Sequence, residues 1–375
     1  MSYNRVNLEI SLGKLERNVN QIRSVSNCQM IAMIKANAYG HGVNEIHHFL
    51  HKSCSINEFG LASIDEAVKL RKSSGIYSSK LIVFSDVSLA GDNRFKDYLD
   101  YKVIPVISSR EDLEYFLANN ANTSIPLFIK VNTGMNRLGF DIESPESFVS
   151  LLNKYGVKRI DHLMTHFSSS NLEASQSSKV MFQYKKFQKF KSELQASKIT
   201  LVDTSVSNSG AIEQGIGYEE THVRPGILLY GASVLDKPLR KNAAVKPQLV
   251  SSMRTSVIDS FEVRKGTEVG YGNIEVTSDG LIVVVGVGYG DGLPTRYSGA
   301  RVLSEKYLGH VFGRINMDLT SILFPRDAKF QKGTEIELWG DNSISLTDLS
   351  DEIGLIPYEI LCNVGQRINK EYVLN

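Results

Sequence analysis

Short apolar runs alternate with amphipathic segments through the first two thirds of the chain. Helical patterns fit residues 12–25, 64–72, 109–118, 144–154 and 176–196. The apolar runs between them have the length of strands and occupy residues 29–34, 57–62, 80–84, 102–107, 125–131, 159–166, 200–206 and 221–230. Eight buried strands separated by helices are typical of a parallel (β/α)8 barrel, so the pattern predicts an α/β fold of this type.

The pattern changes after about residue 235. Residues 237–247 are polar and basic, as in a linker, and residues 346–353 fit a short helix. The other segments beyond the linker have a β pattern and occupy residues 248–260, 281–287, 308–316, 319–323 and 335–338. A chain of 375 residues favours two domains. We therefore expect a barrel over residues 1–236 and a mainly β domain over 237–375, with a strand at 6–10 as a candidate addition to the second domain.

Charge and cysteine content narrow the class of protein. The chain has 42 Lys and Arg against 41 Asp and Glu, so its net charge gives no argument for nucleic acid or a membrane surface as partner. The N-terminus lacks the apolar core of a signal peptide, and the valine-rich run near residues 281–287 is too short to span a bilayer. Three scattered cysteines, Cys28, Cys54 and Cys362, lack the spacing of a metal site. We expect a cytoplasmic protein with reduced thiols.

Residues 29–42, QMIAMIKANAYGHG, place a lysine directly after the first apolar run. Active-site residues of a (β/α)8 barrel gather at the carboxyl ends of the strands, which is where Lys35 is expected. Desolvation lowers the pKa of a lysine, and a neutral amine can attack a carbonyl to form a Schiff base. Tyr39 would place its hydroxyl beside whatever Lys35 holds. From the residues alone, an ordinary surface lysine at a strand end is the alternative.

Residues 35–42, KANAYGHG, closely resemble the pyridoxal-phosphate lysine motif of the alanine racemase family. Matches to that family continue in the same order over essentially the whole chain, through LFIKVNTGMNRLG (127–139), MTHF (164–167), SNSG (207–210), VRPGILLYG (223–231), GYGDG (288–292), GRINMD (313–318) and PYEILC (357–362). The resemblance implies a pyridoxal-phosphate-dependent isomerase that interconverts L- and D-alanine by a two-base mechanism. It also implies D-alanine supply for a bacterial cell wall, and a homodimer with shared active sites.

The resemblance assigns a role to individual residues. Lys35 would carry the cofactor and act as one base, with Tyr289 as the other. Phosphate dianions are well held by backbone N–H groups and hydroxyls of glycine-containing turns, and the residues that match the phosphate contacts are Tyr39, Ser209, Gly226, Ile227 and Tyr358.

Arg224 would face the pyridine nitrogen of the cofactor. A guanidinium is always charged and only donates hydrogen bonds, so it favours an unprotonated ring nitrogen and a weaker electron sink, which suits racemisation over transamination. His166 would hydrogen-bond Tyr289 and contact Arg224.

The substrate end of the pocket would use Arg137, Met317 and Asp318. Arg137 would pair with the substrate carboxylate. Lys130 matches a lysine that is often carbamylated in the family, which would make it an anion able to orient Arg137. An unmodified, ion-pairing Lys130 is the alternative.

Some positions depart from the usual family pattern. GYGDG replaces Gly-Tyr-Ala-Asp-Gly, Asn132 stands in place of aspartate and Asn316 in place of cysteine, and the run 168–171 also differs. These polar changes leave open whether serine is also a substrate. Two other functions are alternatives. A decarboxylase of the same architecture is disfavoured by Arg224 and GYGDG, and a non-catalytic pyridoxal-phosphate carrier is disfavoured by the second domain.

Three histidines, at positions 47, 48 and 51, have helical spacing but no acidic residue or cysteine to complete a metal site. They are predicted to be exposed helix residues, and no metal site is predicted.

Overall fold

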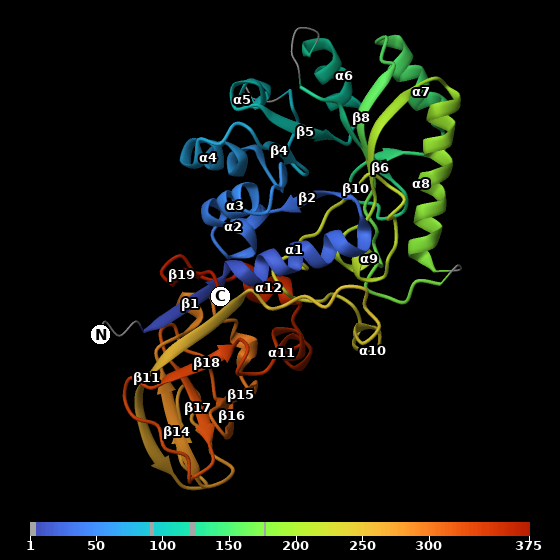
Figure 1. Ribbon diagram of the computed structural model, residues 1–375. Coiled ribbons are helices and arrows are strands. Elements are labelled where there is room, and N and C mark those ends of the chain that lie inside the picture. Colours follow the sequence, from blue (N-terminus) through green and yellow to red (C-terminus); the bar gives the residue numbers. More distant parts are fainter. Residues whose placement is uncertain (1–4, 91–93, 121–124, 176–177) are drawn as a thin grey trace.

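A computed structural model describes residues 5–90, 94–120, 125–175 and 178–375. Its first domain is a closed barrel of eight parallel strands, because β5 and β6 pair and complete the ring (Figure 1). The strands are β2 (Gln29–Met33), β3 (Glu58–Leu61), β4 (Lys80–Val83), β5 (Val103–Ile107), β6 (Phe128–Asn132), β8 (Arg159–Met164), β9 (Thr200–Ser205) and β10 (His222–Val223). The prediction of a (β/α)8 barrel is confirmed.

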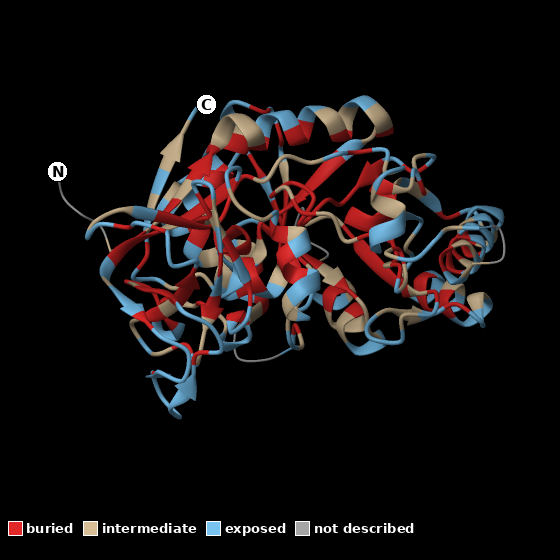
Figure 2. Cartoon of the chain, turned by 90° about the horizontal axis from the view of Figure 1, so that it is seen from below, coloured by how far each residue is buried: buried red, intermediate tan, exposed pale blue. Residues whose placement is uncertain are grey.

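Helices connect the strands and cover the outside of the barrel (Figures 1 and 2). They are α1 (Leu12–Ser26), α3 (Val43–Lys52), α4 (Ile64–Ser74), α5 (Arg94–Asp100), α6 (Arg110–Asn119), α7 (Pro145–Lys154) and α8 (Lys179–Ala196). A serine hydroxyl accepts a hydrogen bond from the third residue after it and starts α1, α4, α6 and α8. The predicted helices are confirmed at similar bounds, and residues 176–177 of the last one lie outside the described residues.

The predicted strand over 221–230 is wrong beyond its first residues. β10 contains only His222 and Val223. Pro225 has no N–H to donate to a neighbouring strand, and the chain then turns, with the N–H of Leu229 donating to the carbonyl of Gly226 at 3.0 Å. The apolar residues 227–230 are fully buried inside these turns. The apolar run therefore predicted burial correctly, but it did not show that these residues form a strand.

The second domain is built on a sheet in the order β15-β16-β17-β14-β11-β1-β19, with β18 also paired to β11. Its strands are β1 (Val6–Ser11), β11 (Ser251–Val263), β14 (Gly280–Val285), β15 (Arg301–Ser304), β16 (Tyr307–Phe312), β17 (Thr320–Phe324), β18 (Glu335–Trp339) and β19 (Asn369–Val373). β1 pairs antiparallel with β11 and parallel with β19, so both ends of the chain join one sheet. The predicted mainly β region is confirmed.

Shorter elements complete the second domain. They are the hairpin of β12 (Glu268–Val269) and β13 (Ile274–Glu275), 3-10 turns at Tyr289–Asp291 and Thr295–Tyr297, and the helices α11 (Leu346–Ile353) and α12 (Pro357–Cys362). The predicted linker begins with a one-turn helix, α10 (Lys237–Arg240), so it is not wholly irregular. Among the described helices, none combines the length and apolarity that a membrane span requires.

A buried asparagine on α1 ties the end of the barrel to the following segment. Asn18 is fully buried, and its amide group donates to the carbonyls of Leu229 at 2.9 Å and Gln248 at 2.8 Å. Its side-chain oxygen accepts from the N–H of Gln248 at 2.7 Å. One side chain thus satisfies three backbone groups where the chain leaves the barrel for β11.

We predict that Asn18→Ala lowers the free energy of unfolding by about 2 to 4 kcal/mol, because it leaves buried backbone groups without partners. Chemical denaturation would measure the change. Asn20→Ala is the matched control, since Asn20 lies exposed on the same helix and should change stability by less than about 0.5 kcal/mol. Equal effects of the two substitutions would contradict the role assigned to Asn18.

Candidate active site

The carboxyl ends of the barrel strands bring ten of the sequence-predicted site residues into one region. These are Lys35, Tyr39, Lys130, Arg137, His166, Ser209, Arg224, Gly226, Ile227 and Tyr358, which are joined by the contacts and electrostatic interactions described below. They come from the ends of β2, β6, β8, β9 and β10 and from α12. The site therefore draws on both the barrel and the C-terminal segment.

Lys35 begins an unusual left-handed turn. Residues Ala36 to Tyr39 have φ values of 52°, 55°, 55° and 52°, although none of them is glycine. Each such residue costs about 1 to 2 kcal/mol, and strain of this type is concentrated at functional sites. The surroundings hold the turn, because Glu66 accepts from the N–H of Ala36 at 2.8 Å and Asn37 accepts from the N–H of Val43 at 2.9 Å. The turn fixes where the Lys35 side chain leaves the backbone.

Two lysine amines face a shared excess of positive charge. Burial lowers the pKa of Lys35, and the charge of Arg137 lowers it further, although Glu66 opposes the effect. Burial also lowers the pKa of Lys130, to about 8, with further contributions from Arg137, Arg224 and Lys35. Both amines are therefore more readily deprotonated than free lysine, as a nucleophile or a carbamylated amine requires.

Arg224 is held inside the barrel by three oxygen acceptors. Its guanidinium donates to the Ser205 hydroxyl and to the Thr165 carbonyl through short hydrogen bonds, and more weakly to the Val206 carbonyl at 3.4 Å. Burial lowers its pKa to about 9, which still leaves it charged at neutral pH. Burial and the adjacent charge of Arg224 hold the pKa of His166 well below its usual value, so His166 is a neutral imidazole.

Hydroxyls and backbone N–H groups form a compact cradle beside Tyr39. Ser209, the first residue of α9 (Ser209–Glu213), accepts from the N–H groups of Gly226 at 3.0 Å and Leu228 at 3.3 Å. The Tyr358 hydroxyl is hydrogen-bonded to Ser209. A Cβ at position 226 would clash with the Tyr39 hydroxyl, so glycine is needed for this close approach. The cradle presents the polar groups that suit a phosphate.

The remaining predicted residues form a second group in the β domain. Tyr289 and Met317 are 48% and 54% exposed, and their segments are joined because the N–H of Gly290 donates to the Met317 carbonyl at 2.9 Å. Asp318 accepts from Arg367 at 2.8 Å. Within the described parts of the chain, no hydrogen bond or ion pair links this group to Lys35. Within the described residues of this chain, the two sequence-predicted bases are therefore not joined by a polar contact.

The prediction that the three helix histidines are exposed is wrong for His47. His47 is fully buried on α3 and hydrogen-bonds the Ser79 hydroxyl at 3.0 Å, while burial lowers its pKa to about 4. His51 is half-buried against the carbonyl of Ile56, and His48 is exposed. The helical spacing placed these residues on neighbouring positions of one helix, but the loop before β4 supplied a polar partner that the pattern did not reveal.

Sequence reasoning missed the residues that position the predicted ones. Ser205 and Thr165 hold Arg224, and Glu66 holds the backbone at both Ala36 and Ala62. The alternation along residues 200–206 offered one signal, because it puts Ser205 on the inward face of its strand. Nothing in the local sequence distinguishes Glu66 from other helix carboxylates.

We predict that Lys130→Met makes stability less dependent on pH. Because folding lowers the Lys130 pKa to about 8, the native state is penalised below pH 8, and stability rises with pH as the folded and then the unfolded chain lose this proton. In carbon-dioxide-free buffer, the stability advantage of Lys130→Met over wild type should fall by roughly 2 to 3 kcal/mol between pH 7 and pH 10.

Unfolding by denaturant at several pH values would measure this difference. Lys158→Met, which removes an exposed lysine, is the control and should show no comparable trend. If the difference in free energy of unfolding between Lys130→Met and wild type stayed constant across this range, the lowered pKa of Lys130 would be refuted.

Two family models match this chain. The alanine racemase N-terminal domain matches residues 10–234, and the alanine racemase C-terminal domain matches residues 250–372. Alanine racemase of Halothermothrix orenii is 31% identical, with 97% of this chain and 96% of that protein covered. Alanine racemase of Coxiella burnetii is 29% identical, with 97% of this chain and 98% of that protein covered.

Solved structures agree over the whole length. The alanine racemase of Acinetobacter baumannii has a TM-score of 0.84 at 26% identity, with 98% of this chain and 99% of that chain covered. The biosynthetic alanine racemase of Pseudomonas aeruginosa has a TM-score of 0.85 at 25% identity, with 99% of each chain covered. Sequence and structure together show that this chain belongs to the alanine racemase family, whose members are isomerases.

Proposed function

We propose that this protein interconverts L- and D-alanine with pyridoxal 5'-phosphate as its cofactor. The observation that carries the proposal is the meeting of Lys35, Arg224 and the hydroxyl cradle at one barrel mouth. A desolvated amine, a fixed guanidinium and a phosphate-sized set of donors are what this cofactor needs at its aldehyde, ring nitrogen and phosphate. Lys35 follows β2, Ser209 follows β9 and Arg224 follows β10, so their convergence follows from the fold.

The residues present fit the cofactor. Ser209, Tyr39 and Tyr358 supply hydroxyls, and the backbone N–H groups of Gly226 and Ile227 lie in the same turn. Pyridoxal phosphate, when bound, supplies the electron sink that stabilises negative charge on the α-carbon of the amino acid. The chain's own residues bind it, orient it and move the protons.

Lys35 and Tyr289 are the two proton carriers in this proposal. Racemisation needs one group to remove the α-proton and another to return a proton from the opposite face. The lowered pKa of Lys35 suits proton transfer near neutral pH. His166, held neutral beside Arg224, is available to hydrogen-bond Tyr289 when that tyrosine is brought to the barrel mouth.

Arg224 restrains competing chemistry. Its two terminal nitrogens are committed to oxygens of the barrel interior, so its position is fixed before any ligand binds. A charged donor disfavours protonation of a facing ring nitrogen. Arg224 in this position would favour racemisation over transamination, and the decarboxylase alternative would have a carboxylate in place of Arg224.

The substrate is a small amino acid. Arg137 is proposed to pair with its carboxylate, and Lys130, either carbamylated or unmodified, to orient Arg137. Met317 and Asp318 are proposed to close the far end of the pocket. The polar departures at Asn132 and Asn316 support slow acceptance of serine. The free thiols of Cys28 and Cys54 support a cytoplasmic location, where the product would supply D-alanine for a bacterial cell wall.

Incubation of the protein with L-alanine and pyridoxal phosphate in deuterated water tests the reaction. We expect D-alanine to form with deuterium at the α-carbon, because the second base, which delivers the new proton, carries solvent deuterium. Chiral chromatography with mass spectrometry would read both quantities. Pyruvate without D-alanine would indicate transamination, and carbon dioxide release would indicate the decarboxylase; either result would refute the proposal.

The attachment site provides the control for this experiment. Borohydride reduction of the loaded protein should abolish racemisation, and peptide mapping should place the pyridoxyl group on Lys35. Lys130, the other lysine of the barrel mouth, is the internal comparison because the pKa of its amine is also lowered. Labelling of Lys130 in place of Lys35 would overturn the assignment.

We also propose a homodimer in which each active site takes Lys35 from one subunit and Tyr289 from its partner. The exposure of Tyr289 and Met317 supports this, because both would be covered when the β domain of one subunit lies over the barrel mouth of the other. A twofold axis makes the two sites equivalent. Covering the mouth would also exclude water from the reacting carbon.

Mixing two inactive variants tests the shared site. Lys35→Ala and Tyr289→Phe homodimers should each be nearly inactive. After random subunit exchange about half of the dimers are mixed, and each mixed dimer has one intact site of two, so roughly a quarter of wild-type activity should return. Exchange verified by mass spectrometry without recovered activity would show that Tyr289 serves its own subunit.

A further inference from the structure

The opposite end of the barrel contains a second polar cavity. It has a volume of about 530 Å³ and is lined by residues at the amino-terminal ends of β2, β3, β4 and β10, among them Glu58, Lys80 and His222, and by Asp203 of β9. The barrel mouth with Lys35 lies at the carboxyl ends of the same strands. The cavity is therefore separate from the proposed active site.

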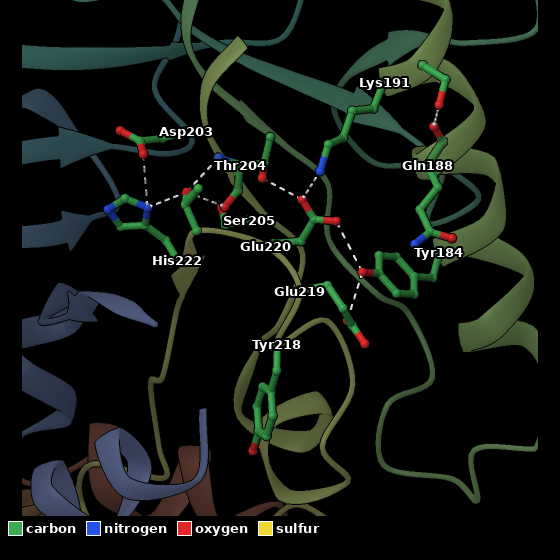
Figure 3. Close-up of polar contacts among 12 residues, drawn as sticks. Tyr184, Gln188, Lys191, Asp203, Thr204, Ser205, Tyr218, Glu219, Glu220 and His222 are labelled. Carbon is green, nitrogen blue, oxygen red and sulfur yellow. Dashed lines mark hydrogen bonds and ion pairs between the residues drawn. The ribbon is translucent and has the colours of Figure 1, made fainter. Parts of the chain in front are cut away.

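Three metal-ligand side chains meet at this end. His162 of β8, Asp203 of β9 and His222 of β10 each offer one ligand atom, and these atoms all lie within 4.8 Å of one another. Nδ1 of His222 is 3.7 Å from Oδ1 of Asp203 (Figure 3). The two imidazole rings are 5.1 Å apart between centroids. These spacings are those of ligands that need only small shifts to close on one ion.

His162 has a buried nitrogen that lacks a partner. The side chain is fully buried, and its Nε2 lies 2.7 Å from the Ser205 hydroxyl. Nδ1 has no hydrogen-bond partner among the described residues. In one tautomer this atom is an unsatisfied donor, and in the other it is an unsatisfied lone pair. A cation would satisfy the lone pair, whereas a purely structural role leaves a buried nitrogen without a hydrogen-bond partner.

His222 is oriented as a metal ligand is. While its Nδ1 faces Asp203, its Nε2 lies 3.3 Å from Oε2 of Glu58. A carboxylate at the second ring nitrogen fixes the tautomer and orientation of a ligating histidine, and Oε2 of Glu58, which has no hydrogen-bond partner among the described residues, lies in this position. The Thr221 hydroxyl also lies 2.8 Å from Nδ1, but it is 3.0 Å from the Thr204 carbonyl and keeps that partner if a metal takes Nδ1.

The charges of the cavity suit a transition metal. Lys80 lies 2.6 Å from Oε1 of Glu58 and neutralises it, which leaves Asp203 as the anionic ligand. Two imidazoles and one carboxylate are a ligand set of Zn²⁺ and Co²⁺, not of Mg²⁺ or Ca²⁺, which prefer oxygen.

We propose that the amino-terminal end of the barrel binds one Zn²⁺-class ion through His162, Asp203 and His222, with Glu58 orienting His222. Three protein ligands leave a coordination position open to the cavity. This site does not depend on the racemase reaction, and its test reads the metal directly.

Cobalt titration of the full-length protein tests the site after chelator treatment and gel filtration. We expect one Co²⁺ per chain, visible d–d absorption typical of mixed nitrogen and oxygen ligation, and displacement by one equivalent of Zn²⁺. Wild-type protein that binds no Co²⁺ and no Zn²⁺ in this experiment would overturn the proposal.

Variants locate the ion. Asp203→Asn keeps the side-chain shape and His222→Gln removes one imidazole; each should weaken binding at least tenfold, and Glu58→Gln should weaken it by about 10- to 100-fold. His48→Gln is the control, because it removes an exposed histidine that does not line the cavity and should leave the affinity unchanged. Thermal melting of the metal-free variants checks that they fold. The test needs only one of Asp203→Asn and His222→Gln to be folded. Unchanged affinity in the folded variant would place the ion elsewhere and refute the proposal.

Discussion

The concentration of positive charge at the barrel mouth is the constraint on which the site depends. Lys35, Lys130, Arg137 and Arg224 lie close enough to act on one another's charge or on that of His166, and only Glu66 among their principal electrostatic partners is a carboxylate. Like charges in a buried region raise the free energy of the protonated forms. The protein responds by making two amines easier to deprotonate. An anion that entered the mouth would relieve the same repulsion, so the charge that strains the free protein favours anionic ligands.

Backbone strain is placed at the same point. Four consecutive non-glycine residues after Lys35 adopt the left-handed conformation. Such a turn persists only because surrounding groups fix it. Glu66 spans two backbone segments, through the N–H groups of Ala36 and Ala62, and thereby links the turn to the end of β3. The carboxylate therefore serves the backbone and also moderates the charge of Lys35, which couples the geometry of the site to its electrostatics.

The sequence predicted the features that have a local pattern. The barrel strands were visible as apolar runs, and the helices as amphipathic periods. The ordered motifs, through their resemblance to a known family, named the residues that the structure gathers at the mouth. The run 221–230 was misassigned because apolar character reports burial in turns as well as in strands. The burial of His47 depended on Ser79, a contact between distant segments that no periodicity encodes.

The residues of the β domain show a second limit of prediction from sequence patterns. Tyr289 and Asp318 were identified by motif, yet the groups that they meet depend on packing between surfaces and not on the pattern within either domain. The place of β1 in the sheet of the second domain, between β11 and β19, is likewise decided by pairing between residues far apart in the chain. Sequence pattern locates chemical groups along the chain, while long-range pairing decides which groups meet.

A line of polar side chains runs through the barrel interior, where bulky apolar residues usually pack. Ser205 lies at its centre, because Arg224 donates to its hydroxyl from the mouth side and His162 contacts it at 2.7 Å from the base side. A serine has one proton to donate, so the tautomer of His162 decides whether that proton points towards the imidazole or elsewhere. The base of the barrel therefore sets the hydrogen bonding of the residue that holds Arg224. The two ends of the barrel thus share one hydroxyl, and the tautomer of His162 acts on the group that holds Arg224.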